Sequence, residues 1–308
     1  MCKPLLAFPS LAVLGACVFV AAQDAGPAKV RLRLVDLATG NSVGGIVRVT
    51  DADGKQIELP GLFDRMAGLV KDLPGVHWYV VPAGGADTML PRGKLHLAAL
   101  SGLESERVEQ DIDLRKAVPA ELTVQLPFLF HPAATGLVAG NTHLHLRNFS
   151  METADNYLRN IPAADGLRVL FISYLERDQE DATYITNQYP IGDLPRFAAT
   201  GVLFNNGEEH RHNFAGFGEG YGHVMFLNLE ELVQPVSSGP GITGGGFDDV
   251  ALRPGIDNAH KQGATILWCH NTYGFEDVLS AISGRLDALS VFDGSRIGKK
   301  TRTTTTVT

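Results

Sequence analysis

Residues 141–146 read Asn-Thr-His-Leu-His-Leu, and this stretch decides how the second half of the chain is interpreted. In a β-strand the side chains at positions i and i+2 point to the same face, so His143 and His145 project together while Leu144 points away. Two neutral imidazole nitrogens on one face are typical of a site for Zn or a similar divalent ion. The alternative is a solvated strand face, because two polar residues spaced in this way are common without a metal.

Further candidate ligands stand at the ends of other predicted strands. The run Gly207-Glu208-Glu209 follows an apolar segment and offers a carboxylate, His223 opens an apolar segment, and His270 closes one. In a β/α barrel, residues at the carboxyl ends of the strands converge on one mouth. Widely spaced histidines with a carboxylate are typical of a hydrolase with several metal ions, and the close Cys/His pairs of a zinc finger are absent from the sequence.

From residue 131 onward, strand-like and helix-like segments alternate, which predicts a parallel sheet or barrel over residues 131–297. The predicted helices are 151–160, 250–262 and 275–284. The predicted strands are 142–146, 167–172, 201–205, 223–228, 264–269 and 286–292.

The preceding part of the chain, residues 28–130, has the pattern of an all-β domain. Short apolar segments with alternating side chains are separated by turns, and helical periodicity is absent, which predicts a β-sandwich. The segments 46–50 and 56–59 flank Asp51-Ala52-Asp53-Gly54 and predict a hairpin. We find no cluster of nucleophiles or metal ligands here, and the isolated His77 and His96 are interpreted as ordinary structural residues.

The two ends of the chain differ from the rest. Residues 1–22 carry one lysine near their start, Lys3, continue with an apolar stretch and end in Val-Ala-Ala. This pattern predicts a secretory signal peptide and a periplasmic or extracellular location. An uncleaved anchor, or a lipid anchor at Cys17, are the alternatives. After cleavage at Ala22 only Cys269 remains of the three cysteines, which precludes an intrachain disulfide. Residues 298–308 are of low complexity, and we expect them to be disordered.

Composition excludes several classes of protein. The 308 residues carry a net charge of −8, with 44% hydrophobic and 19% charged residues, which indicates a folded globular chain. Because there is no basic patch, we expect no nucleic-acid partner. With signal cleavage no membrane span remains, and the expected partner is a small-molecule substrate. The sequence leaves the oligomeric state open.

Residues 138–293 resemble the PHP-type metallohydrolases, and in particular the CehA/McbA-like branch of exported or periplasmic proteins. The HxH motif of that family matches His143 and His145, and its GxE motif matches residues 207–209. A Gly-His before an apolar strand matches His223, and a histidine that closes a strand matches His270.

This resemblance implies an N-terminal β-sandwich followed by a distorted (β/α)7-type barrel. It implies hydrolysis of an amide, ester, carbamate or phosphoester by a metal-activated water, with two or three divalent ions (Zn, or Mn/Fe) in the complete family site. It selects Glu209 as the bridging carboxylate. Near Glu209, we interpret His212 as a candidate catalytic proton shuttle, and a solvated polar loop is its alternative. The implied metal ligands are His143, His145, Glu209, His223 and His270.

The chain departs from the family in two places. Ser173-Tyr174-Leu175 stands where these proteins usually carry Asp-His, and the similarity stops near Arg296, before a late Asp/His motif. We interpret this as a barrel incomplete at its C-terminus, with at least one weakened metal position and weak or absent hydrolysis. The alternative function is a non-catalytic binding protein or pseudoenzyme in which the β-sandwich is the binding module.

Overall fold

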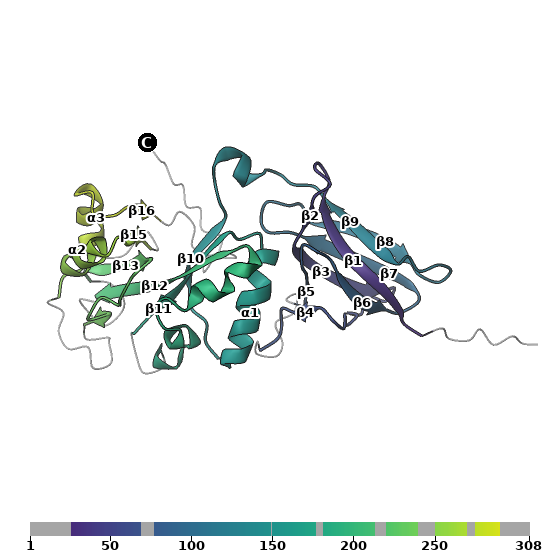
Figure 1. Cartoon of the computed structure of the whole chain (residues 1–308), viewed down its shortest axis with the longest axis horizontal. Coiled ribbons are helices and arrows are strands. Elements are labelled where there is room, and N and C mark those ends of the chain that lie inside the picture. The colour runs from purple at the N-terminus through teal and green to yellow at the C-terminus, as the bar shows by residue number, and fades with distance from the viewer. Residues whose placement is uncertain are drawn as a thin grey trace, which may run out of the picture.

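A computed structural model describes residues 26–68, 77–148, 150–176, 181–212, 220–239, 250–269 and 275–289. Within these ranges the chain is mostly β-strand, with three sheets and three α-helices (Figure 1). The predicted signal segment 1–22, the tail 298–308 and His270 lie outside the described residues. Among the helices that are described, none has the length and apolar character needed to cross a membrane.

Two sheets form the N-terminal part of the molecule. Strand β1 (Ala28–Asp36) is central in the first sheet, where it pairs with three others: β2 (Ser42–Val43), β6 (Ala86–Leu90) and β9 (Glu121–Leu126). The second sheet has the order β4 (Phe63–Asp64), β5 (Tyr79–Val81), β3 (Gly45–Asp51), β7 (Lys94–Leu100) and β8 (Val108–Asp113).

The two N-terminal sheets enclose one hydrophobic cluster. Val30, Leu32 and Leu34 of β1 are buried and alternate with arginines, as the sequence pattern predicts. They share the cluster with residues of the second sheet, among them Val47 and Leu97. At roughly 25 cal/mol per Å² of apolar surface, such a shared core is the main stabilising contribution to this part of the chain.

The hairpin predicted around residues 51–54 forms, but its second strand is very short. The turn forms, but after it only one bridge, between Thr50 and Gln56, joins β3. The pairing stops there because β5 occupies the same edge of β3 at residues 45–47, and β7 occupies the other edge. The segment 56–59 therefore has no free edge along which to extend.

The third sheet is a curled half-barrel formed by the second half of the chain. Strand β14 (Ser237–Ser238) pairs beside β12. The other strands follow the order β10 (Gly140–Leu144), β11 (Val169–Tyr174), β12 (Leu203–His212), β13 (Gly222–Leu227), β15 (Thr265–Trp268) and β16 (Ala288–Leu289).

This sheet is mixed rather than parallel, which corrects the expectation from the alternating pattern. Strands β10, β11 and β12 are parallel to one another, but β13 is antiparallel to both β12 and β15. No described helix lies between β12 and β13, and an antiparallel pair does not need the long crossover that parallel neighbours require.

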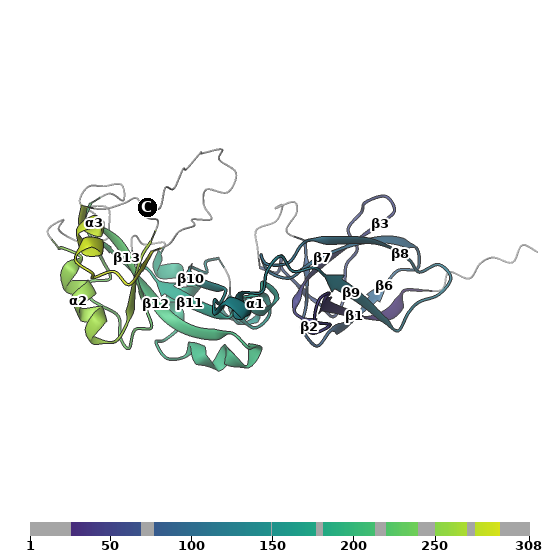
Figure 2. The same cartoon turned by 90° about the horizontal axis from the view of Figure 1, so that it is seen from above.

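Helix α1 (Met151–Ala164) lies between the N-terminal sheets and the curled sheet (Figures 1 and 2). It starts at Ser150, whose hydroxyl accepts a hydrogen bond from the amide of Thr153 (3.1 Å). Its Leu158 packs in a cluster with β11, whereas Ile161 packs against Trp78 and Val80 of the five-stranded sheet. The helix therefore contributes to two hydrophobic cores at once.

The remaining helices cover the curled sheet. Helix α2 (Arg253–Lys261) packs on β13 and β15 through Ile256 and Ala259. Helix α3 (Phe275–Ile282) follows β15. Four short 3-10 helices complete the described elements: Pro132–Thr135, Asp181–Thr183, Ile185–Gln188 and Leu194–Thr200.

Asp155 of α1 connects the helix to the segment before β12. Its carboxylate accepts hydrogen bonds from Tyr189 Oη (2.9 Å) and from both terminal nitrogens of Arg196 (3.0 Å each). Burial alone raises the pKa of Asp155, but the hydrogen bonds from Arg196 and Tyr189 outweigh burial and hold the pKa below its ordinary value.

We expect Asp155→Asn to lower the free energy of unfolding at pH 7 by about 1.5–3 kcal/mol, the usual range for a hydrogen bond to a charged group. Because the pKa is lower in the folded state, this contribution is present above the unfolded-state pKa and disappears as the pH falls below about 4. Urea unfolding at several pH values measures it. The control is Asp193→Asn, which removes a more exposed partner of Arg196 and is expected to cost under about 0.5 kcal/mol.

Candidate metal centre

His143, His145 and Glu209 converge on one point of the curled sheet. The Nε2 atoms of His143 and His145 are 2.9 Å apart, and they lie 3.1 and 2.9 Å from Oε2 of Glu209. Ligand atoms around a tetrahedral zinc ion with bonds of 2.0–2.1 Å are separated by about 3.3 Å. The three atoms thus form a nearly equilateral triangle of a size close to that of one face of a zinc site, and the group can hold a metal ion.

The backbone around His143 and His145 directs both rings to the same point. The pairing of β10 with β11 has a register shift between Asn141 and Leu144, which indicates a bulge at the HxH motif. The side chain of Asn141 accepts a hydrogen bond from the amide of His143 (3.0 Å). The two rings meet nearly perpendicular, at 80°, so that their Nε2 atoms approach while the ring planes avoid each other.

Hydrogen bonding indicates which nitrogen of His145 is available as a ligand. Its Nδ1 lies 2.9 Å from the backbone oxygen of Ser173, which can only accept, so Nδ1 carries the hydrogen. In the neutral ring, Nε2 then presents a lone pair toward an oxygen of Glu209. Two acceptor atoms at this separation need a cation between them, either a proton or a metal ion, and this carbonyl contact is typical of histidine ligands to metals.

Glu209 is a buried carboxylate that requires positive charge beside it. The residue is 3% exposed, and burial by itself raises its pKa. The contacts with His143 and His145 outweigh burial and hold the pKa of Glu209 well below its ordinary value. A positive charge at the two rings therefore stabilises the ionised carboxylate.

The two histidines are partly open to solvent, although Glu209 is not. Their side chains are 20% and 18% exposed, and the ring of Tyr184 lies 6.0 Å from that of His145. A small molecule can approach the group from the side of the imidazoles, and the carboxylate forms its buried wall.

His223 lies next to this group because β13 runs antiparallel to β12. The start of β13 is placed beside the end of β12, with His223 opposite Arg211, so a residue that opens a strand meets residues that close one. His223 is 2% exposed, and its Nε2 is 4.0 Å from Oε1 of Glu209. It is adjacent to the group of three but is not within ligand distance of the same point.

His212 does not lie in the group, which corrects the interpretation of this residue as a proton shuttle beside Glu209. The segment is not a solvated loop but the buried end of β12, where successive side chains point to opposite faces of the sheet. Glu209 and Arg211 therefore face the inside of the curled sheet, and Glu208, His210 and His212 face outward. The Nδ1–H of His212 donates to the carbonyl of Val250 (2.7 Å).

The outward face of β12 is a neutral polar layer. Burial raises the pKa of Glu208 to about 8, and it lowers the pKa values of His210 and His212 to about 3 and 4. Oε1 of Glu208 lies 2.8 Å from Nδ1 of His210, and Oε2 accepts from the amide of Val233 (2.7 Å). The His210 ring stacks on Phe226 at 4.7 Å. These residues pack β12 against Val233, Val250 and helix α2. Among the described residues, they have no contact with the candidate metal site.

Cys269 is also part of the packing. It is fully buried in a small cluster with Met225 and Leu267, and its thiol donates to the carbonyl of His223 (3.4 Å). His270 follows it directly but lies outside the described residues.

Arg211 is a site residue that the sequence did not single out. Arg211 lies on the same face as Glu209, and its Nη1 is 3.2 Å from Oε1 of that carboxylate. The signal that predicts this contact is the i, i+2 rule already applied to His143 and His145.

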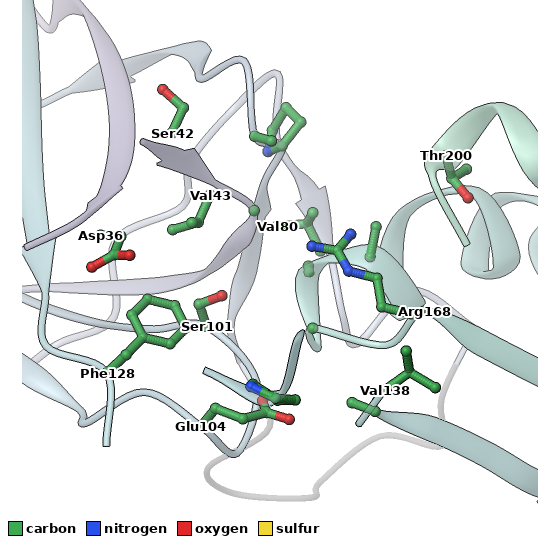
Figure 3. Close-up of a pocket in the computed structure, with 18 of the residues that line it drawn as sticks. Asp36, Ser42, Val43, Val80, Ser101, Glu104, Phe128, Val138, Arg168 and Thr200 are labelled. Carbon is green, nitrogen blue, oxygen red and sulfur yellow. The ribbon is translucent and has the colours of Figure 1, made fainter. Parts of the chain in front are cut away.

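A cavity in the described part of the chain is separate from the metal group. It has a volume of about 400 Å³ and lies between the N-terminal strands and the segment after α1, with Asp36, Val80 and Glu104 on one side and Arg168 on the other (Figure 3). None of the residues that line it belongs to the metal group. Volume alone does not identify the chemical site of this chain.

No protein-family model matches the chain, and no curated protein matches its sequence. The case for a function therefore depends on the geometry of the site.

Gly255 of α2 provides a test of the outward face of β12. A Cβ atom at this position would lie 2.2 Å from Nε2 of His210. We expect Gly255→Ala to destabilise the protein by about 1–3 kcal/mol through overpacking, reduced by up to about 1 kcal/mol of helix propensity. Urea unfolding measures the change. Gly93→Ala is the control, since its Cβ would meet nothing within 4 Å, and equal stability of both variants would contradict the packing described here.

Proposed function

We propose that this chain is a metal-dependent hydrolase of the PHP type, with a β-sandwich before a curled catalytic barrel. The observation that carries the proposal is the triangle formed by the Nε2 atoms of His143 and His145 and Oε2 of Glu209. Two imidazoles and one carboxylate, with a position left open, are a ligand set found in catalytic zinc sites. Structural zinc sites are instead closed by four protein ligands.

A bound divalent ion would lower the pKa of a water toward neutrality and polarise the oxygen of a scissile carbonyl or phosphoryl group. The proposed substrates are amides, esters, carbamates or phosphoesters. The partial exposure of both histidines supports access to the open position. No serine nucleophile is required for this chemistry.

The residues of the chain have distinct proposed roles. His143 and His145 hold the ion, and the carbonyl of Ser173 orients the His145 ring. Glu209 supplies negative charge from the buried side, which favours a divalent ion over a neutral ligand. His223, whose Nε2 lies 4.0 Å from the other oxygen of Glu209, would contact the substrate.

Replacing His143 with alanine tests the proposal. Removal of one of three protein ligands is expected to reduce the affinity for Zn²⁺ by roughly two orders of magnitude or more, since even outer partners of metal ligands contribute 10–100-fold. Hydrolysis of chromogenic esters and phosphoesters should fall in parallel. Metal content of the purified protein, measured by mass spectrometry, is the first readout.

His96→Ala is the control for this experiment. His96 lies on β7 and its ring is within 3.0 Å of Asp111, so it is also a histidine beside a carboxylate, but it belongs to the N-terminal sheets. Its replacement should leave metal content unchanged. Unchanged metal content in His143→Ala would contradict the proposal, and metal binding without hydrolysis would favour the alternative, a non-catalytic binding protein.

A further inference from the structure

The two oxygens of Glu209 face different partners. Oε2 faces His143 and His145, at 3.1 and 2.9 Å. Oε1 faces Arg211, whose Nη1 is 3.2 Å away, and His223, whose Nε2 is 4.0 Å away. A carboxylate that bridges two metal ions, as the family resemblance implies for Glu209, must offer one oxygen to each ion.

Arg211 lies where a second ion would need to approach. In two-metal sites the ions are about 3.5–4 Å apart, and an oxygen ligand lies about 2.0–2.2 Å from its ion. An ion at that distance from Oε1 would be close to the guanidinium, which cannot lose its charge in a protein. The Arg211 side chain is 16% exposed, so solvent screens this repulsion only weakly.

The neighbouring strand provides no acidic ligand for a second ion. Ser173 pairs with Gly207 in the register of β11 and β12, so its side chain lies on the same face as Glu209. Its hydroxyl is buried and has no hydrogen-bond partner among the described residues. In the same part of the chain, His143, His145 and Glu209 are the only group of three ligands close enough to share an ion.

We propose that Arg211 takes the place of a second metal ion at Oε1 of Glu209, so that the chain binds a single divalent ion. This inference rests on the proposed function, because it assumes that the first ion binds at His143 and His145. The guanidinium then supplies a fixed positive charge on the second side of the carboxylate. Arg211 acts through Glu209 and is a positioning residue.

The test is the number of Zn²⁺ or Co²⁺ ions bound per chain, measured by calorimetric titration of the metal-free full chain. The wild-type chain should bind one ion. Arg211→Gln removes the charge but keeps a side chain of similar length, and it should gain a second, weaker binding event at Oε1 and His223. Arg211→Lys keeps the charge and should again bind one ion. The absorption spectrum of the Co²⁺ form reports whether the first site keeps its geometry in each variant.

Each outcome decides the inference. Two ions in the wild-type chain would overturn it. This measurement is made on the wild-type chain itself, so it does not depend on whether a variant folds. One ion in both the wild-type chain and Arg211→Gln would also overturn it, because Arg211 would then not be what prevents a second ion. His143→Ala separates the two proposals: if the single ion remains in that variant, the proposed function fails, whereas its loss leaves only the role of Arg211 to be decided.

Discussion

The buried carboxylate of Glu209 is the constraint on which the inner side of the curled sheet depends. An isolated charge in a protein interior is strongly unfavourable, so cationic or metal-binding partners must lie beside it. They come from three sequence segments, namely His143 on β10 with His145 just after it, Arg211 on β12 itself, and His223 on β13. The strand order of the sheet brings these segments together. A divalent ion adds positive charge at the place where the lone pairs of the donors already meet.

The two faces of strand β12 differ in their electrostatic environment. On the inside, Glu209 stays ionised because cationic or metal-binding groups surround it. On the outside, adjacent Glu208 has its pKa raised to about 8 by burial and shares a contact with the neutral His210. Two glutamates that are neighbours in the sequence therefore differ in charge at neutral pH: Glu208 is mainly neutral and Glu209 is negative. The pleat of the strand directs them into different environments.

Helix α1 couples the N-terminal sheets to the site. The helix begins shortly after β10, which carries the HxH motif, and it packs both on the strands of the curled sheet and on Trp78 and Val80. An ion pair between Arg65 and Asp165 joins the two parts just beyond its end. Packed side chains of α1 thus connect the N-terminal core with the cluster that contains Leu144 of β10, even though the N-terminal part contains no member of the described metal group.

The sequence by itself determined the strands, because alternation in segments such as Val30–Leu34 and the HxH spacing follow from the period of two along a single strand. It also determined which side chains share a face of a strand, and therefore that His143 and His145 point to the same side. It did not determine strand direction, because β13 is antiparallel, nor the length of the pairing after the turn that follows β3, because that pairing depends on which edge other strands leave free. Tertiary structure decided that β12 continues to His212, and in a strand of that length alternation turns His212 away from Glu209 and brings Arg211 to it. The boundaries predicted for that segment ended the strand near residue 205, whereas residues 207–212 pair with β13 and His210 packs against Gly255 of α2.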